Sequence, residues 1–287
     1  MSTNVTEPDV FAAEVPRDVV EATGPDTASF LQGQLSQDVA ELPLGESRYS
    51  LLLQPQGKVD AWLRVTRTGP ETFLLDVEAG WGQAVIGRLE RFKLRTRCSL
   101  RIVDGWRCWA VRGTDEANLS HPVAPGVLVV AAHWPGCAGY DLIGEQLEAP
   151  LAIAVDNTDR YLGARIAAGV PALGAELDDG TIPAEAGTWL IERSVSFTKG
   201  CYTGQELVAR VDSRGSNTPR KLRLLEAAGG LAVGAELHLG PELVGVVTSA
   251  AAHGRTALAY LKRSVEPPST VQLAGGEAVR VEPLPAS

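Results

Sequence analysis

The sequence predicts an α+β fold, in which strands joined as hairpins alternate with helices. Residues 48–77 read as three consecutive strands, and the connections PQGK and TGPE between them are rich in turn-forming residues. Apolar residues then recur at helical spacing from Trp81 to Phe92. Past Pro219, short strands follow one another with Gly and Pro between them. Because strands joined by tight turns pair antiparallel, these observations favour α+β over a doubly wound parallel sheet.

The N-terminal elements follow from local signals. Residues 1–16 are polar and contain prolines, which predicts a frayed tail, and they lack the basic and apolar regions of a secretory signal. A short strand is expected at 19–23, and Asp26 stands where the N-cap of a helix belongs. Helical spacing along that helix predicts one buried stripe, formed by Leu31, Leu35, Val39 and Leu42.

The rest of the chain divides into three regions. Between 107 and 143 we expect the short strands CWAVRG, GVLVVAA and YDLI, separated by loops rich in Pro and Gly. Residues 147–171 predict one or two helices that end at Gly169, with a proline two residues later. Five strands after a boundary at 217–221 predict a small β-barrel or sandwich: KLRLLEA, AELHLG, ELVGVVTSA, TALAYLKR and AVRVEP.

Composition excludes several classes of function. The 287 residues predict two or three domains, and no apolar run is long enough for a membrane helix. A net charge of −9 argues against an extended nucleic-acid surface, which needs many Lys and Arg side chains. The cysteines form no CxxC pair and have no histidine at ligand spacing, so neither a zinc site nor a disulfide framework is expected. A reducing cytoplasm is the simplest setting.

The segment TKGCYTGQE (198–206) is the strongest candidate for a chemical site. Cys201 would lie just ahead of a helix N-terminus, and Lys199 adds a positive charge two residues away. Both effects favour a reactive thiolate, although a free cysteine is most often a small buried hydrophobe. We interpret Cys201 as functional and the other three cysteines as structural. Thr203 and Glu206 have capping-box spacing, which gives Glu206 a structural role.

Two further stretches could bind a polar ligand. Polar side chains crowd the segment FLQGQLSQDV, and they are Gln32, Gln34, Gln37 and Asp38. They could hydrogen-bond a heterocycle or simply face solvent, and spacing does not decide between these alternatives. Arg165 and Glu185 could frame a pocket, although each taken singly is more often a surface charge.

Taken together, these stretches resemble the YgfZ family of folate-binding proteins, relatives of the aminomethyltransferase (T-protein) of the glycine cleavage system. The signature match is KGCYTGQE at 199–206, followed by LVAR. Supporting matches are GPDTASFLQGQLSQDV, QPQGKVDAWLRV and RIAAGVP. ELVGVVTSA is similar to the barrel that ends both families, and the resemblance spans roughly residues 17–265.

The resemblance implies three domains in a ring around a central folate-binding channel. The folate-binding portion would comprise 17–105 and 151–215, a second α+β portion 106–150, and the barrel 216–287. It also implies tetrahydrofolate or a derivative as ligand and a cytoplasmic role in assembling or maintaining iron–sulfur clusters. The implied partners are client enzymes with such clusters, including tRNA-modifying ones, with no membrane and no direct nucleic-acid contact.

The resemblance and the residues together give a predicted site. Cys201, the functionally important cysteine of the family motif, is expected to act with Lys199. The folate is expected to contact Gln32, Gln34, Asp38, Arg165, Glu185, Tyr202 and Gln205.

One departure from the T-protein bears on the reaction. The T-protein glutamate that binds the pterin ring falls on Ala167 here, which argues against aminomethyl transfer unless Glu185 substitutes for it in space. The alternatives are a folate-dependent one-carbon transferase and a hydrolase or acyltransferase in which Cys201 is the nucleophile. The last would need a general base oriented toward the thiol.

Overall fold

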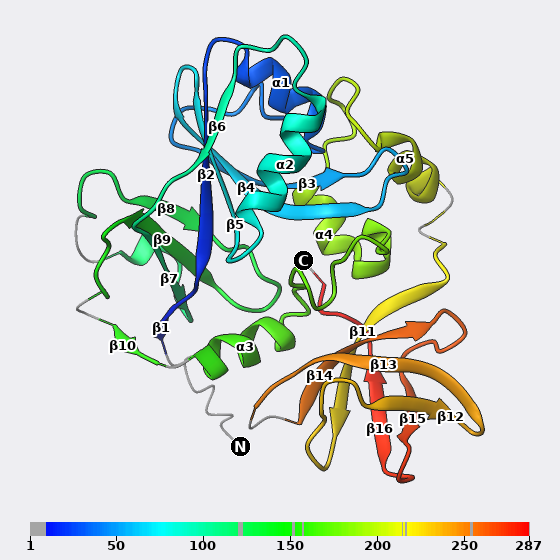
Figure 1. The fold of residues 1–287 in the computed structure, drawn as a ribbon. Coiled ribbons are helices and arrows are strands. Elements are labelled where there is room, and N and C mark those ends of the chain that lie inside the picture. Colours follow the sequence, from blue (N-terminus) through cyan, green and yellow to red (C-terminus); the bar gives the residue numbers. More distant parts are fainter. Residues whose placement is uncertain are drawn as a thin grey trace.

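Two five-stranded sheets and a closed six-stranded barrel form the framework of the protein (Figure 1). The computed structural model describes residues 10–286 apart from 120–122, 151–152, 157, 214, 216 and 253–254. The first sheet has the strand order β3 (Ser47–Leu53), β4 (Val59–Gly69), β5 (Thr72–Glu78), β2 (Arg17–Thr23) and β6 (Ser99–Ile102). All of its neighbouring strands pair antiparallel. The hairpins expected within 48–77 are therefore confirmed.

The second sheet includes a strand from the N-terminal segment. Its order is β10 (Ala154–Val155), β1 (Phe11–Glu14), β7 (Trp106–Arg112), β9 (Gly139–Glu145) and β8 (Leu128–Ala131). Strand β1 pairs antiparallel with β7 and buries Phe11, Ala12 and Ala13. The sequence predicted a tail through residue 16, but β1 completes this sheet because its apolar side chains are buried there.

The C-terminal barrel confirms the sequence prediction and adds one strand to it. Its strands, in spatial order, are β11 (Arg220–Ala227), β14 (Thr256–Lys262), β13 (Glu242–Ala250), β12 (Glu236–Leu239), β15 (Ser269–Leu273) and β16 (Ala278–Glu282). Strand β15 was missed because it is short and three of its five residues are polar. The fold class is thus α+β with a six-stranded antiparallel barrel.

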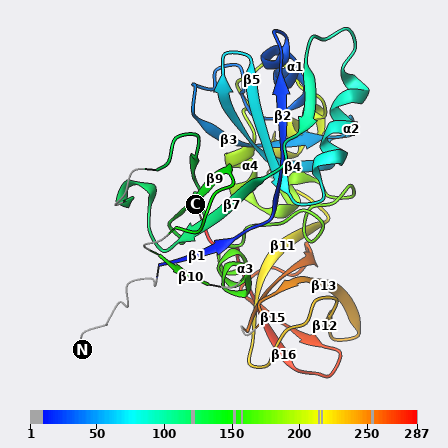
Figure 2. The ribbon, with the colours of Figure 1, turned by 60° about the vertical axis from the view of Figure 1, so that its left-hand side comes forward.

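Some helices pack on the sheets, and others lie between the sheets and the barrel. They are α1 (Thr27–Gln34), α2 (Gly82–Phe92), α3 (Thr158–Ala167), α4 (Thr188–Ser194) and α5 (Gln205–Ser213), with 3₁₀ turns at Glu116–Asn118 and Pro183–Ala186. Figure 2 shows α3 between the second sheet and the barrel. In the described ranges, no helix is long and apolar enough to cross a membrane.

Helix α1 is shorter than the apolar repeat predicted. At Leu35 the backbone becomes extended and forms a bridge with Leu52. Ser36 Oγ then donates to the carbonyl of Ser194 at 2.6 Å and accepts from the amide of Leu51 at 2.8 Å. Leu35, Val39 and Leu42 are fully buried as predicted, but all three lie beyond the helix, which ends at Gln34. These contacts with residues remote in sequence override the local helical pattern.

Candidate functional site

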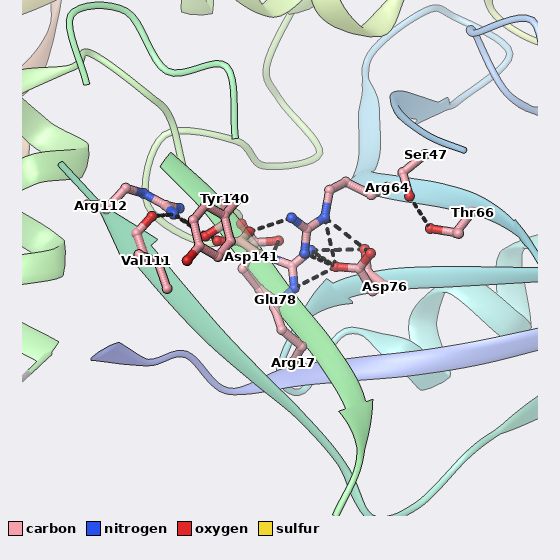
Figure 3. A network of polar contacts seen from close by, with 10 residues as sticks. All are labelled: Arg17, Ser47, Arg64, Thr66, Asp76, Glu78, Val111, Arg112, Tyr140 and Asp141. Carbon is pink, nitrogen blue, oxygen red and sulfur yellow. Dashed lines mark hydrogen bonds and ion pairs between the residues drawn. The ribbon is translucent and has the colours of Figure 1, made fainter. Parts of the chain in front are cut away.

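A chain of buried ion pairs lies where the two sheets meet, and Figure 3 shows its members. Arg64 on β4 is 2% exposed and donates through Nη2 to Asp76 of β5 at 2.7 Å. Its Nη1 donates to Asp141 on β9, which belongs to the other sheet. Arg64 therefore joins the first sheet to the second.

The chain of charges continues at both ends. Arg17 Nε donates to Asp76 at 3.0 Å, and Arg112 Nη1 donates to Asp141 at 2.8 Å. Burial raises the pKa of each aspartate, but the adjacent arginines more than offset this, so the pKa of both lies below its usual value. The site thus holds alternating fixed charges: Arg17, Asp76, Arg64, Asp141 and Arg112.

Aromatic rings surround this network. Tyr49 stacks on Trp62 with ring centroids 4.9 Å apart and planes 18° apart. Trp134 and Tyr161 form a second pair at 5.3 Å, and the Arg112 guanidinium lies 4.0 Å from the Trp134 ring centre. Flat apolar faces beside fixed charges are what a polar aromatic ligand requires.

Two cavities adjoin the network, and both are lined by Tyr49 and Arg64. The outer cavity has a volume of 290 Å³, and its wall also includes Arg48, His133 and Arg193. The inner chamber is narrow, with a volume of 30 Å³. Its lining is aromatic and charged: Tyr49, Trp62, Trp134, Tyr161, Arg17, Arg64, Arg165, Glu78 and Asp141, with Leu63, Val170 and Pro171.

Of the polar residues predicted around α1, Gln37 lines the outer cavity, whereas Gln32, Gln34 and Asp38 line neither cavity and stabilise local structure. Gln32 Oε1 accepts from the amide of Val39 at 2.8 Å, and its Nε2 donates to Asp38 at 3.0 Å. Gln34 Oε1 accepts from Arg88, which also pairs with Asp60. These bonds close the loop that follows α1 and attach α2 to the first sheet.

Arg165 and Glu185 do not form one pocket. Arg165 is buried, lines the inner chamber, and donates to Glu176 at 3.0 Å and to Ser249 at 2.7 Å. Glu185 accepts from Arg220 at 2.9 Å, which ties a 3₁₀ turn to the start of the barrel. Glu185 is not among the lining residues of either cavity.

Lys199 contacts backbone carbonyls in the last turn of α1 and in the segment that follows it. Its Nζ donates to the carbonyls of Gln32 and Leu35, both at 2.6 Å, and of Gln37 at 3.0 Å. Burial lowers the pKa of Lys199 to about 8. These contacts make Lys199 a residue that positions the loop carrying Cys201, because three acceptors saturate its ammonium donors.

The predicted capping box of Thr203 and Glu206 does not form at the start of α5, which begins at Gln205. Gln205 Oε1 accepts from the amide of Tyr202 at 3.2 Å, whereas Glu206 is exposed and lies 3.7 Å from Arg210. Tyr202 is buried and its ring lies under the Lys199 ammonium. Gln205 and Tyr202 therefore hold the motif in place, and they too are absent from the walls of both cavities.

Two glycines let the motif dock onto the turn between β3 and β4. A Cβ at Gly204, where φ is +85°, would lie 2.6 Å from the carbonyl oxygen of Gln54. A Cβ at Gly57 would lie 2.5 Å from Leu207 Cβ on α5. The PQGK turn and the KGCYTGQE motif are thus in contact, and any side chain at either glycine would separate them.

Cys201 is exposed beside this contact, whereas Cys98 and Cys108 are buried. Burial raises the pKa of the Cys108 thiol to about 12. We therefore expect iodoacetamide at pH 8 to alkylate Cys201 more than about 100-fold faster than Cys108, because the thiolate is the nucleophile. Peptide mass spectrometry of the folded protein measures both rates, with the urea-unfolded protein as the control. Equal rates in the folded state would contradict the placement of these thiols.

The sequence reasoning missed the central residues of the network: Arg17, Arg64, Asp76, Arg112 and Asp141. The signal that could have found them is a charged residue inside an apolar strand, as in AWLRV and YDLI. Such a charge is rarely buried unless it is paired.

Sequence comparisons find relatives that match part of the chain. No protein-family model matches the chain. An uncharacterized protein of Haemophilus influenzae is 29% identical over 205 residues, which cover 69% of this chain and 67% of that protein. The tRNA-modifying protein YgfZ of Photorhabdus laumondii is 28% identical, covering 69% and 65%. A mitochondrial iron–sulfur cluster assembly factor IBA57 homologue of Phaeosphaeria nodorum is 28% identical, covering 75% and 55%.

The structural comparison concerns the whole fold. The glycine cleavage system aminomethyltransferase T of Bartonella henselae superposes with a TM-score of 0.77, covering 98% of this chain and 87% of that chain at 20% identity. The chain spans about two thirds or less of the length of the curated relatives it matches. It is a distant homologue of the YgfZ and IBA57 proteins and has the aminomethyltransferase fold.

Proposed function

We propose that this distant homologue of YgfZ and IBA57 binds tetrahydrofolate or a close derivative and supports iron–sulfur cluster assembly or maintenance in client enzymes, including tRNA-modifying ones. The observation that carries the proposal is the pair of cavities around Tyr49 and Arg64, at the junction of the two sheets. The names of the relatives motivate the biological role.

The lining chemistry matches the two parts of a folate. The pteridine is a flat polar ring, and the inner chamber offers aromatic and apolar walls with charged groups of both signs. The glutamyl tail carries carboxylates, and Arg48 and Arg193 on the wall of the outer cavity supply positive charge for them. The ring would therefore occupy the inner side and the tail the outer side.

Cys201 is the group through which the protein would meet its clients. The thiol is exposed, and Phe197 in the same loop is 53% exposed beside it in sequence. A single thiolate supplies one of the four ligands that an iron–sulfur cluster usually needs. Cys201 would thus contact a cluster that the client's own ligands also hold.

A titration with tetrahydrofolate tests the ligand. We expect saturable quenching of tryptophan fluorescence at sub-millimolar ligand, because Trp62 and Trp134 line the inner chamber. p-Aminobenzoylglutamate, which lacks the pteridine, is the matched control and is expected to bind more weakly. No saturable signal from tetrahydrofolate would contradict both the folate proposal and the one-carbon transferase alternative. An assay for turnover with an aminomethyl donor then separates these two.

A further inference from the structure

Glu78, at the end of β5, carries a carboxylate oxygen that the fold leaves without a hydrogen-bond partner. Within the described residues, Glu78 Oε2 is buried and accepts no hydrogen bond, and Glu78 lines the inner chamber. A buried acceptor without a donor is destabilising, and more so when the group is charged. A ligand that supplies donors at this position would remove this destabilisation.

The neighbours of Glu78 balance its charge without donating a hydrogen bond to its Oε2. Arg17 Nη1 lies 3.7 Å from Oε2, close enough for an ion pair but too far for a hydrogen bond. The other donors of Arg17, Nε and Nη2, are engaged by Asp76. Glu78 Oε1 meets the amide of Leu173 at a long 3.5 Å. The carboxylate therefore lies beside Arg17 and Leu173, while its Oε2 accepts no hydrogen bond from the described residues.

The chamber around Glu78 suits a flat ring. Tyr49, Trp62, Trp134 and Tyr161 contribute aromatic surface to its wall, and Val170 and Pro171 contribute apolar surface. Its volume is 30 Å³, so a ring fits there only if a side chain of the wall moves, and Tyr49 lines both this chamber and the 290 Å³ outer cavity.

We propose that Glu78 binds the aminopyrimidine edge of the ligand, accepting from the 2-amino group and the adjacent ring N3–H. Two parallel donors on a planar edge match the two oxygens of one carboxylate. This assignment rests on the proposed folate function and deepens it. The assignment gives the chain a carboxylate for the ring despite alanine at position 167. This carboxylate lies on strand β5, whereas position 167 lies on helix α3.

The test compares tetrahydrofolate binding by the wild-type protein, Glu78→Gln and the control Glu71→Gln. Glu71 is exposed in the turn before β5. Glu78→Gln is expected to weaken binding about 10- to 100-fold, the range for hydrogen bonds to a charged group, while Glu71→Gln leaves it unchanged. Urea unfolding of each variant confirms that the fold is retained.

A second ligand separates recognition from a structural role. An analogue with methyl in place of the 2-amino group is expected to bind the wild-type protein about 10-fold more weakly than tetrahydrofolate does. In Glu78→Gln, the analogue and tetrahydrofolate are expected to bind equally well. If wild-type protein binds tetrahydrofolate and Glu78→Gln binds equally well, the assignment of Glu78 is wrong and the folate function stands. If the analogue binds more weakly than tetrahydrofolate by the same factor in both proteins, Glu78 does not contact the 2-amino group. No wild-type binding overturns the function itself.

Discussion

Replacing Glu176 with alanine is expected to lower the free energy of unfolding by about 3–5 kcal/mol, the range for breaking a buried ion pair from one side. Glu176 Oε2 accepts from Arg165 Nη1 and from the amide of Ala172, both at 3.0 Å. Its Oε1 accepts from the hydroxyls of Thr248 at 2.7 Å and Ser249 at 2.6 Å on the barrel. One fully buried carboxylate thus joins α3 and the segment after it to the barrel.

Denaturation in urea, followed by tryptophan fluorescence, measures this loss. The matched control is Glu242→Ala, which removes an exposed carboxylate 2.8 Å from Lys262 within the barrel. We expect the control to cost about 1 kcal/mol or less, because exposed ion pairs contribute little. A loss below about 1 kcal/mol for Glu176→Ala would show that Arg165, Thr248 and Ser249 find other partners.

The accuracy of the sequence predictions depended on how local each signal was. The strands within 48–77 and the helix α2 were predicted because turn residues and apolar spacing lie within each segment. The end of α1 was not predicted, because the hydroxyl of Ser36 donates a hydrogen bond to a carbonyl 158 residues away in the sequence. A pattern read within one window contains no information about such a partner.

The same reasoning explains why the sequence did not indicate the cavities. The motif around Cys201 was conspicuous, but several of its polar side chains bind the backbone. Lys199 donates to carbonyls in the last turn of α1 and just after it, and Gln205 accepts from the amide of Tyr202. The cavities lie at the Arg64–Asp141 pair, which is formed by residues 77 positions apart on different sheets. Their meeting depends on how the sheets pack, which the sequence does not specify locally.

The Arg64–Asp141 pair gives the second large effect, and it depends on pH. Asp141→Asn is expected to cost about 3 kcal/mol at pH 7, because Arg64 and Arg112 lose a buried counter-charge. The adjacent arginines hold the pKa of Asp141 below its usual value despite the opposing effect of burial. A carboxyl with a lowered pKa in the folded state stabilises fully above its unfolded pKa of about 3.9, and that contribution is lost as the pH falls through the folded pKa.

The difference in unfolding free energy between wild type and Asp141→Asn should therefore be constant from about pH 5 to 8 and shrink below about pH 4. Urea unfolding at a series of pH values measures this, with Asp104→Asn as the control, because Asp104 is exposed. The control should track wild type at every pH. A deficit for Asp141→Asn that persists undiminished down to pH 2 would mean that the lost stability comes from altered packing between the sheets. A deficit that disappears with acid would instead assign it to the ionised carboxylate that joins Arg64 to Arg112.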